Sequence, residues 1–237
     1  MRTLSSALTA VAGWLVEPAP DPAGVAAAAP VADDFIDPAR PVVAVAGLRR
    51  RVGVTTLARA IGGLLAVREP AGACVVTCAG SGGSVPLGLP AAIRLGRRLA
   101  PVVGTRTRAC GRLCLVESAE PAALCAASRA LAPLVLDVSD PAQAATAASL
   151  ADHVVLVAGP DAEPSLAAVV AESLAVVGPE PVIVINRARR GSEKWEEEPH
   201  VPVPESRLAA HFAAAGRDPS GPFGEAVAGL AARWAGG

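Results

Sequence analysis

Residues 41–66 combine a short apolar run, a turn rich in glycine and arginine, and an amphipathic pattern. The apolar run at 42–46 predicts a buried strand, and the spacing of Leu57, Ile61 and Leu65 predicts a helix. The turn between them ends in Gly53, Val54, Thr55 and Thr56. Strand, loop and helix in this order are typical of a phosphate-binding loop, because the first N–H groups of a helix lack internal partners and attract anions. A threonine hydroxyl at that point can hold Mg²⁺ beside the phosphates.

The loop departs from the usual pattern G-x-x-x-x-G-K-[ST] at two positions. Aligned on Gly53 and Thr55, the chain has Leu48 at the first glycine and Val54 at the lysine. A valine side chain brings no charge to a phosphate oxygen. Two interpretations stay open: a phosphate-binding loop without its central charge, or an ordinary turn between strand and helix that is capped by Thr55.

Composition favours a sheet that is covered by helices on both sides. The 237 residues are enough for one domain of medium size with its own core. They are 52% hydrophobic but only 3% aromatic, so alanine, valine and leucine must build that core. A net charge of −1 predicts no general nucleic-acid binding, and the scarcity of aromatic rings argues against stacking on bases.

The cysteines form no disulfide pattern; they are Cys74, Cys78, Cys110, Cys114 and Cys125. A spacing of four along a strand separates two thiols by about 13 Å, too far to share a zinc ion. We therefore expect buried free thiols, with a metal site as the alternative. No apolar run reaches the roughly 18 residues of a membrane span. Together these features predict a protein of the reducing cytoplasm.

Apolar runs and amphipathic stretches alternate along the rest of the chain. Strands are predicted at 72–79, 112–117, 133–138, 153–158 and 181–186, and helices at 89–100, 120–130, 141–150, 165–177, 205–215 and 222–235. Residues 188–204 are polar and predict irregular structure. The alternation predicts an α/β domain over residues 41–237, with a largely parallel sheet flanked by helices on both faces in three layers.

The residues before this domain, 1–40, have a different character. Apolar residues repeat at helical spacing over residues 3–16, which predicts a short amphipathic helix. Residues 17–40 are rich in proline, alanine and aspartate and predict a linker. The helix is interpreted either as packed on the domain edge or as a docking or membrane-surface anchor, although its polar face lacks the basic residues of such an anchor.

Polar residues stand at the predicted carboxyl ends of several strands, where ligands bind in sheets of this kind. Besides the loop, they are residues 81–84, Asp137, residues 159–161, and Asn186 with Arg187. Asp137 has two interpretations, a carboxylate beside magnesium or a cap of the following turn. Asp161 is interpreted as a cap of the helix that follows it.

Several segments, in the same order, resemble the MinD/ParA group of P-loop ATPases, which includes the CpaE and TadZ pilus-assembly proteins. VGVTTL at 52–57 stands where the group has V-G-K-T-T-x. The segments APLVLD, LADHVVLVAGPDAEPSLAAV, PVIVINRARRG and VPVPESRLAAHFAAAGRDP are similar to later segments of the group. The resemblance covers residues 41–235. It implies a P-loop nucleotide fold, ATP or ADP with Mg²⁺, a homodimer and protein partners.

The resemblance also implies roles for individual residues. The residues expected to bind the nucleotide are Arg49, Gly53, Val54, Thr55, Thr56, Asn186 and Arg187. The residues expected to hold magnesium are Thr55 and Asp137. Asn186 matches an asparagine that contacts the base. Arg49 matches a signature lysine that reaches across a dimer.

The same comparison brings out what the chain lacks. Val54 replaces the phosphate-binding lysine, and Arg50 and Arg51 replace two glycines. The aspartate that orients the attacking water has no counterpart in residues 78–81. Losing one charge-assisted hydrogen bond costs about 1.5–3 kcal/mol, a factor of about 10 to 150 in affinity.

These losses predict a degenerate MinD/ParA-like protein, a pseudo-ATPase with weak ATP binding and weak or absent hydrolysis. It would act through protein partners that localise or assemble a pilus, secretion or division machine. The alternatives are an active ATPase with an arginine-containing loop, and a scaffold that binds no nucleotide. No specific nucleic acid is expected as a partner. The expected location is the cytoplasm, with membrane association only through partners or peripheral contact.

Overall fold

The computed structural model describes residues 40–77, 89–99, 101, 106–118, 121–188, 193–195 and 199–234. The helix predicted at 3–16, nearly all of the linker at 17–40, the loop at 81–84 and Cys78 lie outside these ranges. The division of the chain at residue 41 therefore stays a prediction.

One eight-stranded sheet organises the described residues, in the order β3-β4-β2-β5-β1-β6-β7-β8. Its strands are β1 (Val42–Gly47), β2 (Ala73–Thr77), β3 (Arg106–Cys110), β4 (Leu113–Glu117), β5 (Leu134–Val138), β6 (His153–Ala158), β7 (Pro181–Ala188) and β8 (Val201–Pro204). Every neighbouring pair is parallel except β3 with β4. The prediction of a largely parallel sheet is confirmed.

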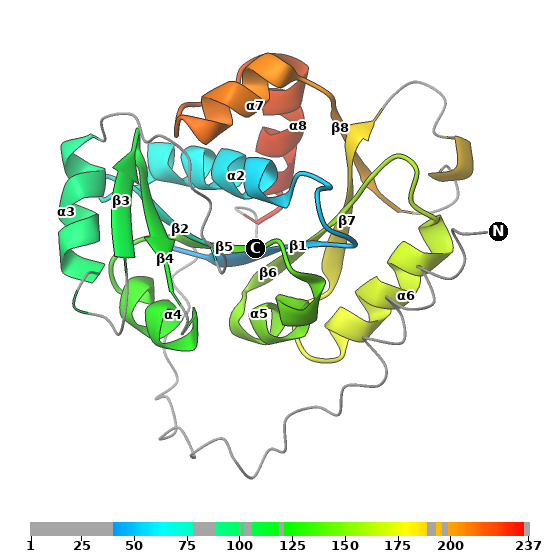
Figure 1. The fold of residues 1–237 in the computed structure, drawn as a ribbon, viewed down its shortest axis with the longest axis horizontal. Helices are drawn as coiled ribbons and strands as arrows, with labels where there is room; N and C mark the ends of the chain where they lie inside the picture. Colours follow the sequence, from blue (N-terminus) through cyan, green and yellow to red (C-terminus); the bar gives the residue numbers. More distant parts are fainter. Residues whose placement is uncertain are drawn as a thin grey trace, which may run out of the picture. The chain divides into compact units, whose positions relative to one another are not determined.

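Helices cover both faces of this sheet (Figure 1). One face carries α2 (Val54–Arg68), α7 (Arg207–Ala214) and α8 (Gly221–Ala232), and the other carries α4 (Pro121–Arg129), α5 (Ala144–Leu150) and α6 (Pro164–Ala175). Helix α3 (Pro90–Leu99) packs on β3 and β4. The described ranges also contain two short 3-10 helices, η2 (Pro141–Gln143) and η3 (Glu193–Trp195). The predicted three-layer α/β architecture is confirmed.

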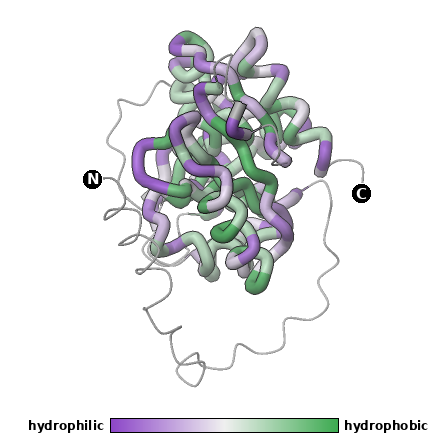
Figure 2. Tube along the Cα trace, turned by 90° about the vertical axis from the view of Figure 1, so that its right-hand side faces the viewer, coloured by the Kyte–Doolittle hydropathy of each residue, from purple (hydrophilic) through white to green (hydrophobic). Residues whose placement is uncertain are grey.

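The central strand β1 is buried along its whole length, which explains its continuous apolar sequence. On the side facing α2, Val43 and Val45 belong to the same core as Leu57 and Ile61. Burying each of these two helix side chains contributes about 1.5–3 kcal/mol. Figure 2 shows a strongly hydrophobic stretch running through the middle of the trace, with hydrophilic stretches on either side of it. The loop between β1 and α2 is thus held between two firmly packed elements.

Two strands were not predicted from the sequence, and both lie at edges of the sheet. Among the described strands, β3 pairs only with β4, and its sequence RTRAC offers no continuous apolar run. Strand β8 falls in the region predicted to be irregular, reads VPVP and has β7 as its one neighbour in the described part of the sheet. Proline cannot donate to a ladder and is tolerated at an edge strand, which is why this sequence did not indicate one.

The described cysteines, Cys74, Cys110, Cys114 and Cys125, are all buried, and none of them forms a disulfide. Cys74 and Cys114 are direct neighbours on β2 and β4, and burial keeps the pKa of the Cys74 thiol well above its usual value. In the described ranges, no group of three or more His, Cys, Asp and Glu residues could hold a metal ion. Among the helices described, none has both the length and the apolar character needed to cross a membrane.

Candidate functional site

The loop between β1 and α2 reaches the helix at Gly53. This residue is the N-cap of α2, has a left-handed φ of 94°, and leaves the helix without a side-chain cap. A Cβ there would lie 2.1 Å from Nδ2 of Asn186, so only glycine fits. The interpretation of Thr55 as the cap of an ordinary turn is therefore wrong, because Thr55 lies inside the helix. The first N–H groups of α2 keep the partial positive charge that suits an anion.

Val54 stands where the loop pattern has lysine, and its side chain is buried. It is 4% exposed and joins the apolar core together with Val52. A Cβ on Gly47 would come within 2.8 Å of a Val54 methyl group, so the side chain lies against the end of β1. The space under the loop is filled by hydrocarbon, and position 54 offers no cation to a ligand.

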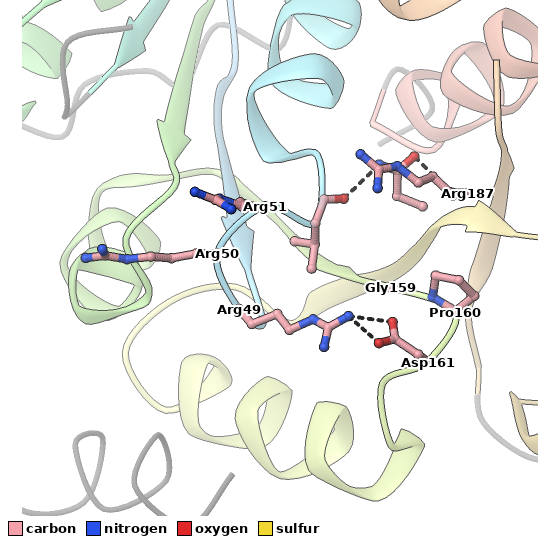
Figure 3. A pocket seen from close by; sticks show the side chains of 9 residues that line it. Arg49, Arg50, Arg51, Gly159, Pro160, Asp161 and Arg187 are labelled. Atoms are coloured by element: carbon pink, nitrogen blue, oxygen red, sulfur yellow. Dashed lines mark hydrogen bonds and ion pairs between the residues drawn. The ribbon is translucent and has the colours of Figure 1, made fainter. Parts of the chain in front are cut away.

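Three consecutive arginines form the outer side of the loop. Arg49 donates to both carboxylate oxygens of Asp161, and Arg50 forms an ion pair of 3.5 Å with Asp140. Figure 3 shows Arg49 turned toward Asp161, with Arg50 and Arg51 extending to the opposite side of the loop. The hydrogen bond from Arg49 lowers the pKa of Asp161. The prediction that Asp161 caps the next helix is wrong, because Glu163 is the N-cap residue of α6.

Two arginines at this site adopt the left-handed backbone conformation that favours glycine. Arg51 has a φ of 65° and Arg187 a φ of 60°, and no other non-glycine residue in the described ranges has a positive φ. A side chain in this conformation costs about 1–2 kcal/mol. The backbone at Arg51 thus has the conformation that a glycine would favour, although an arginine stands at this position.

The side of the loop next to β5 carries a buried carboxylate. Asp137 is 1% exposed, and Oδ1 accepts a hydrogen bond of 3.0 Å from the Ser139 hydroxyl. The hydroxyls of Ser139 and Thr55 lie 3.3 Å apart. Burial raises the pKa of Asp137, while the nearby hydroxyls of Thr55 and Ser139 oppose that rise. Its other oxygen, Oδ2, is buried without a hydrogen-bond partner in the part of the chain that the structure describes.

This donor set fits a magnesium ion held together with phosphates. Thr55 and Asp137 would supply a hydroxyl and a carboxylate oxygen, which are hard ligands of the kind Mg²⁺ prefers, and the phosphates would supply more. The alternative interpretation of Asp137 as a turn cap is wrong, because Asp140 caps the following 3-10 helix by accepting from the N–H of Ala142.

Asn186, near the end of β7, hydrogen-bonds to the loop between β1 and α2. It is 6% exposed, and Nδ2 donates a hydrogen bond of 2.7 Å to the backbone oxygen of Val52. Oδ1 accepts a hydrogen bond of 3.0 Å from the backbone N–H of Arg187. Contact of Asn186 with a base stays a prediction, whereas its contact with the loop was not foreseen from the sequence.

Two cavities open beside the loop at the carboxyl ends of the strands. The larger, about 620 Å³, is lined by Arg50, Arg51, Gly53, Val54, Thr55, Thr56, Ser139, Asp140 and Arg187. The smaller, about 300 Å³, is lined by Arg49, Arg50, Arg51, Val52, Gly159, Pro160, Asp161, Asn186 and Arg187. Every predicted nucleotide-binding residue lines one of them, and Asp137 lies directly beside Thr55 and Ser139. The structure therefore brings the predicted nucleotide-binding residues and the predicted magnesium ligands together, whereas residues 81–84, also expected at this edge of the sheet, lie outside the described ranges.

No protein-family model and no curated protein matches the sequence. Solved structures match the fold over most of the chain. A ParA family ATPase from Chlorobium tepidum aligns with a TM-score of 0.58 at 14% identity, over 81% of this chain and 99% of the other. MinD, a cell division protein of Aquifex aeolicus, aligns with a TM-score of 0.55 at 19% identity, over 83% and 97%. The chain has the fold of the ParA and MinD ATPases.

Two further alignments extend this result. The ATP complex of a Cyanothece McdA variant gives a TM-score of 0.55 at 14% identity, over 81% of this chain and 95% of the other. MinD of Aquifex aeolicus in its complex with MinC gives 0.55 at 17% identity, over 83% and 96%. The ParA and MinD fold was expected from the sequence, and that expectation is confirmed.

Sequence reasoning missed two residues of this site within the ParA and MinD fold, Ser139 and Asp140, and it missed the pairing of a third, Asp161. Ser139 holds the buried Asp137, Asp140 pairs with Arg50, and Asp161 pairs with Arg49. Ser139 and Asp140 stand two and three positions after Asp137, so the polar run at the end of β5 was the available signal. No signal in the sequence indicated the pairing of Asp161 with Arg49, because it joins two separate loops.

Proposed function

We propose that this chain is a degenerate nucleotide-binding protein of the ParA and MinD type. It binds ATP or ADP with Mg²⁺ weakly and hydrolyses ATP slowly or not at all. It acts by binding protein partners that position or assemble a cell structure such as a pilus, secretion or division machine.

The buried Val54 carries this proposal. Phosphoryl transfer depends almost entirely on positioned charge, and this side chain lies in the core where the loop pattern places a lysine. The missing bond weakens phosphate binding by a factor of about 10 to 150. Binding can persist, because the N-terminus of α2, Thr55 and Asp137 keep the arrangement that suits Mg²⁺ and phosphate. The McdA structure with the same fold holds ATP, which supports this part.

The partner role rests on what proteins of this fold do. MinD is named as a cell division protein and was solved in complex with MinC. The resemblance of the sequence to the pilus-assembly members of the group points the same way. The proposal includes a homodimer, because Arg49 matches the lysine that reaches across a dimer in that group. Light scattering after size-exclusion chromatography, with and without ATP, measures this state.

An active ATPase is the second candidate, and one observation favours it. Arg50, Arg51 and Arg187 all line the larger cavity and bring positive charge to the start of α2. An arginine fork suits phosphate, so these side chains could replace the lysine. A scaffold without any nucleotide is the third candidate.

Calorimetry of ATP and ADP binding with Mg²⁺, paired with a hydrolysis assay, separates the three. Wild type is expected to bind weakly without measurable turnover. Val54→Lys is expected to bind ATP about 10-fold to 100-fold more tightly, because it restores the charge. Val54→Met is the matched control, with a long side chain and no charge. Rapid hydrolysis by wild type would establish the second candidate, and no binding by wild type or by Val54→Lys would establish the scaffold.

Imaging of a fluorescently tagged chain in its own cells tests the partner role. A discrete focus or polar pattern is expected, because a positioning protein gathers where its partners are. Asp137→Asn should keep that pattern if nucleotide is dispensable for docking. A uniform distribution of the wild-type chain would contradict the proposed role.

A further inference from the structure

The four arginines around the two cavities divide into two pairs. Arg49 and Arg50 are each paired with an aspartate of this chain, Asp161 and Asp140. Arg51 and Arg187 are both exposed, and within the described ranges neither guanidinium has an acidic partner. Two uncompensated cations therefore remain at this site.

These two cations line the same two cavities although they come from different segments of the chain. Arg51 follows β1 and Arg187 belongs to the end of β7, yet both line the larger and the smaller cavity. They are also the two non-glycine residues with positive φ in the described part of the chain. Backbone strain that persists at a site requires surrounding structure to hold it, and such strain clusters where ligands bind.

A buried acceptor beside the larger cavity points to a cation that would accompany the ligand. Asp137 is 1% exposed, and its Oδ2 has no hydrogen-bond partner among the residues described. It lies beside Thr55 and Ser139, which line that cavity. Positive side chains, free helix N–H groups and a place for Mg²⁺ together suit a chain of phosphates.

The same site offers little with which to recognise a base. Both polar atoms of the Asn186 side chain are engaged, Nδ2 by the Val52 oxygen and Oδ1 by the Arg187 N–H. The residue is 6% exposed, so its amide is turned to the loop and away from solvent. No aromatic side chain is among the described residues that line either cavity. Hydrogen-bond readout and stacking of a base are therefore both weak here.

We infer that this site selects its ligand by the phosphate chain and not by the base, with Arg51 and Arg187 acting as a pair of arms in place of the loop lysine. The ligand class is any compound with a linear chain of phosphates, whether a nucleoside triphosphate or inorganic tripolyphosphate. The inference rests on the proposed function and adds what that site recognises.

Calorimetry of the full chain with Mg²⁺ and four compounds tests the inference. ATP, GTP and inorganic tripolyphosphate are expected to bind within about threefold of one another, and AMP about tenfold or more weaker. ATP binding at least tenfold tighter than both GTP and tripolyphosphate would overturn the inference and leave the proposed function standing. Absence of binding by all four would overturn the inference together with the nucleotide part of the proposed function.

Charge-removing variants test the two arms. Arg51→Gln and Arg187→Gln are each expected to weaken tripolyphosphate binding about tenfold, because each removes a charge-assisted contact. Arg97→Gln, at an exposed position of α3, is the matched control and should bind like wild type. Thermal unfolding of each variant checks that it folds. Unchanged affinity in both folded variants would overturn the assignment of the arms, and either variant alone suffices if the other does not fold.

Discussion

The side-chain amide of Asn186 donates a hydrogen bond of 2.7 Å to the backbone carbonyl of Val52, although 134 positions separate the two residues. The bond ties the end of β7 to the loop that follows β1, across the intervening strand β6. It is buried, so water does not replace it when it is lost. The conformation of the loop thus depends on a residue that the resemblance connects with the base.

Asn186→Ala is expected to lower the free energy of unfolding by about 1–3 kcal/mol, because it leaves the buried Val52 carbonyl without a donor. Urea unfolding measures the loss. Asn186→Asp is the informative companion, since it keeps an acceptor for the Arg187 N–H and removes the donor to Val52. A stability equal to wild type in the aspartate variant would show that the contact with Val52 contributes nothing.

Gly53→Ala is expected to be strongly destabilising for two separable reasons. The new Cβ would lie 2.1 Å from Nδ2 of Asn186, and the φ of 94° is unfavourable for alanine. Combining it with Asn186→Ala removes the collision and leaves the backbone cost of about 1–2 kcal/mol. A double-mutant cycle should therefore show strong positive coupling, and additive effects would argue against the close approach.

Arg51→Gly is expected to raise the free energy of unfolding by about 0.5–1 kcal/mol. Relief of the left-handed strain, about 1–2 kcal/mol, exceeds the entropy cost of a glycine, about 0.5–1 kcal/mol. Arg50→Gly is the control, because Arg50 has no positive φ and should lose stability. Thermal and urea unfolding report both changes. Equal losses in the two variants would contradict the strain at position 51.

The stability of the fold is expected to depend on pH through Asp137. Burial raises the pKa of this carboxyl from its ordinary value of 3.8. Between that value and the raised pKa, the folded state holds the proton more tightly than the unfolded state, so the contribution to stability is lost as pH rises. Asp137→Asn removes this loss. The difference in unfolding free energy, variant minus wild type, should grow as the pH rises above about 4 and level off once the pH exceeds the raised pKa.

Asp218→Asn is the control for this pH series, because it removes one exposed carboxylate without touching the site. A difference between wild type and Asp137→Asn that stays flat over the whole range would contradict the raised pKa. Unfolding measured in buffers of equal ionic strength keeps screening constant.

The sequence allowed the central part of the fold to be predicted because each central strand is a continuous apolar run. Strand β1 and the strands beside it, β5 and β6, are buried on both faces. A continuous apolar run is the sequence pattern that such a strand requires. The edge strands β3 and β8 were missed because pairing on one side removes the need for such a run. Helix boundaries agreed to within a few residues.

The residues of the site were predictable, but most of their contacts were not. Thr55 and Asp137 follow from the loop pattern and the strand end. The bonds from Asn186 to Val52 and from Arg49 to Asp161 join segments more than 100 positions apart. Only the three-dimensional order of the strands brings those segments together.

The hydrocarbon filling under the loop has a consequence for binding kinetics. Val52 and Val54 pack in the core, and Asn186 hydrogen-bonds to the backbone of the loop. The shape of the loop is therefore set before any ligand binds. Association then needs no closing step of the loop, and a first encounter with the arginines is governed by diffusion and by salt concentration. A loop whose shape is set before binding changes little when a ligand binds, so we expect any conformational switching to arise in other parts of the structure.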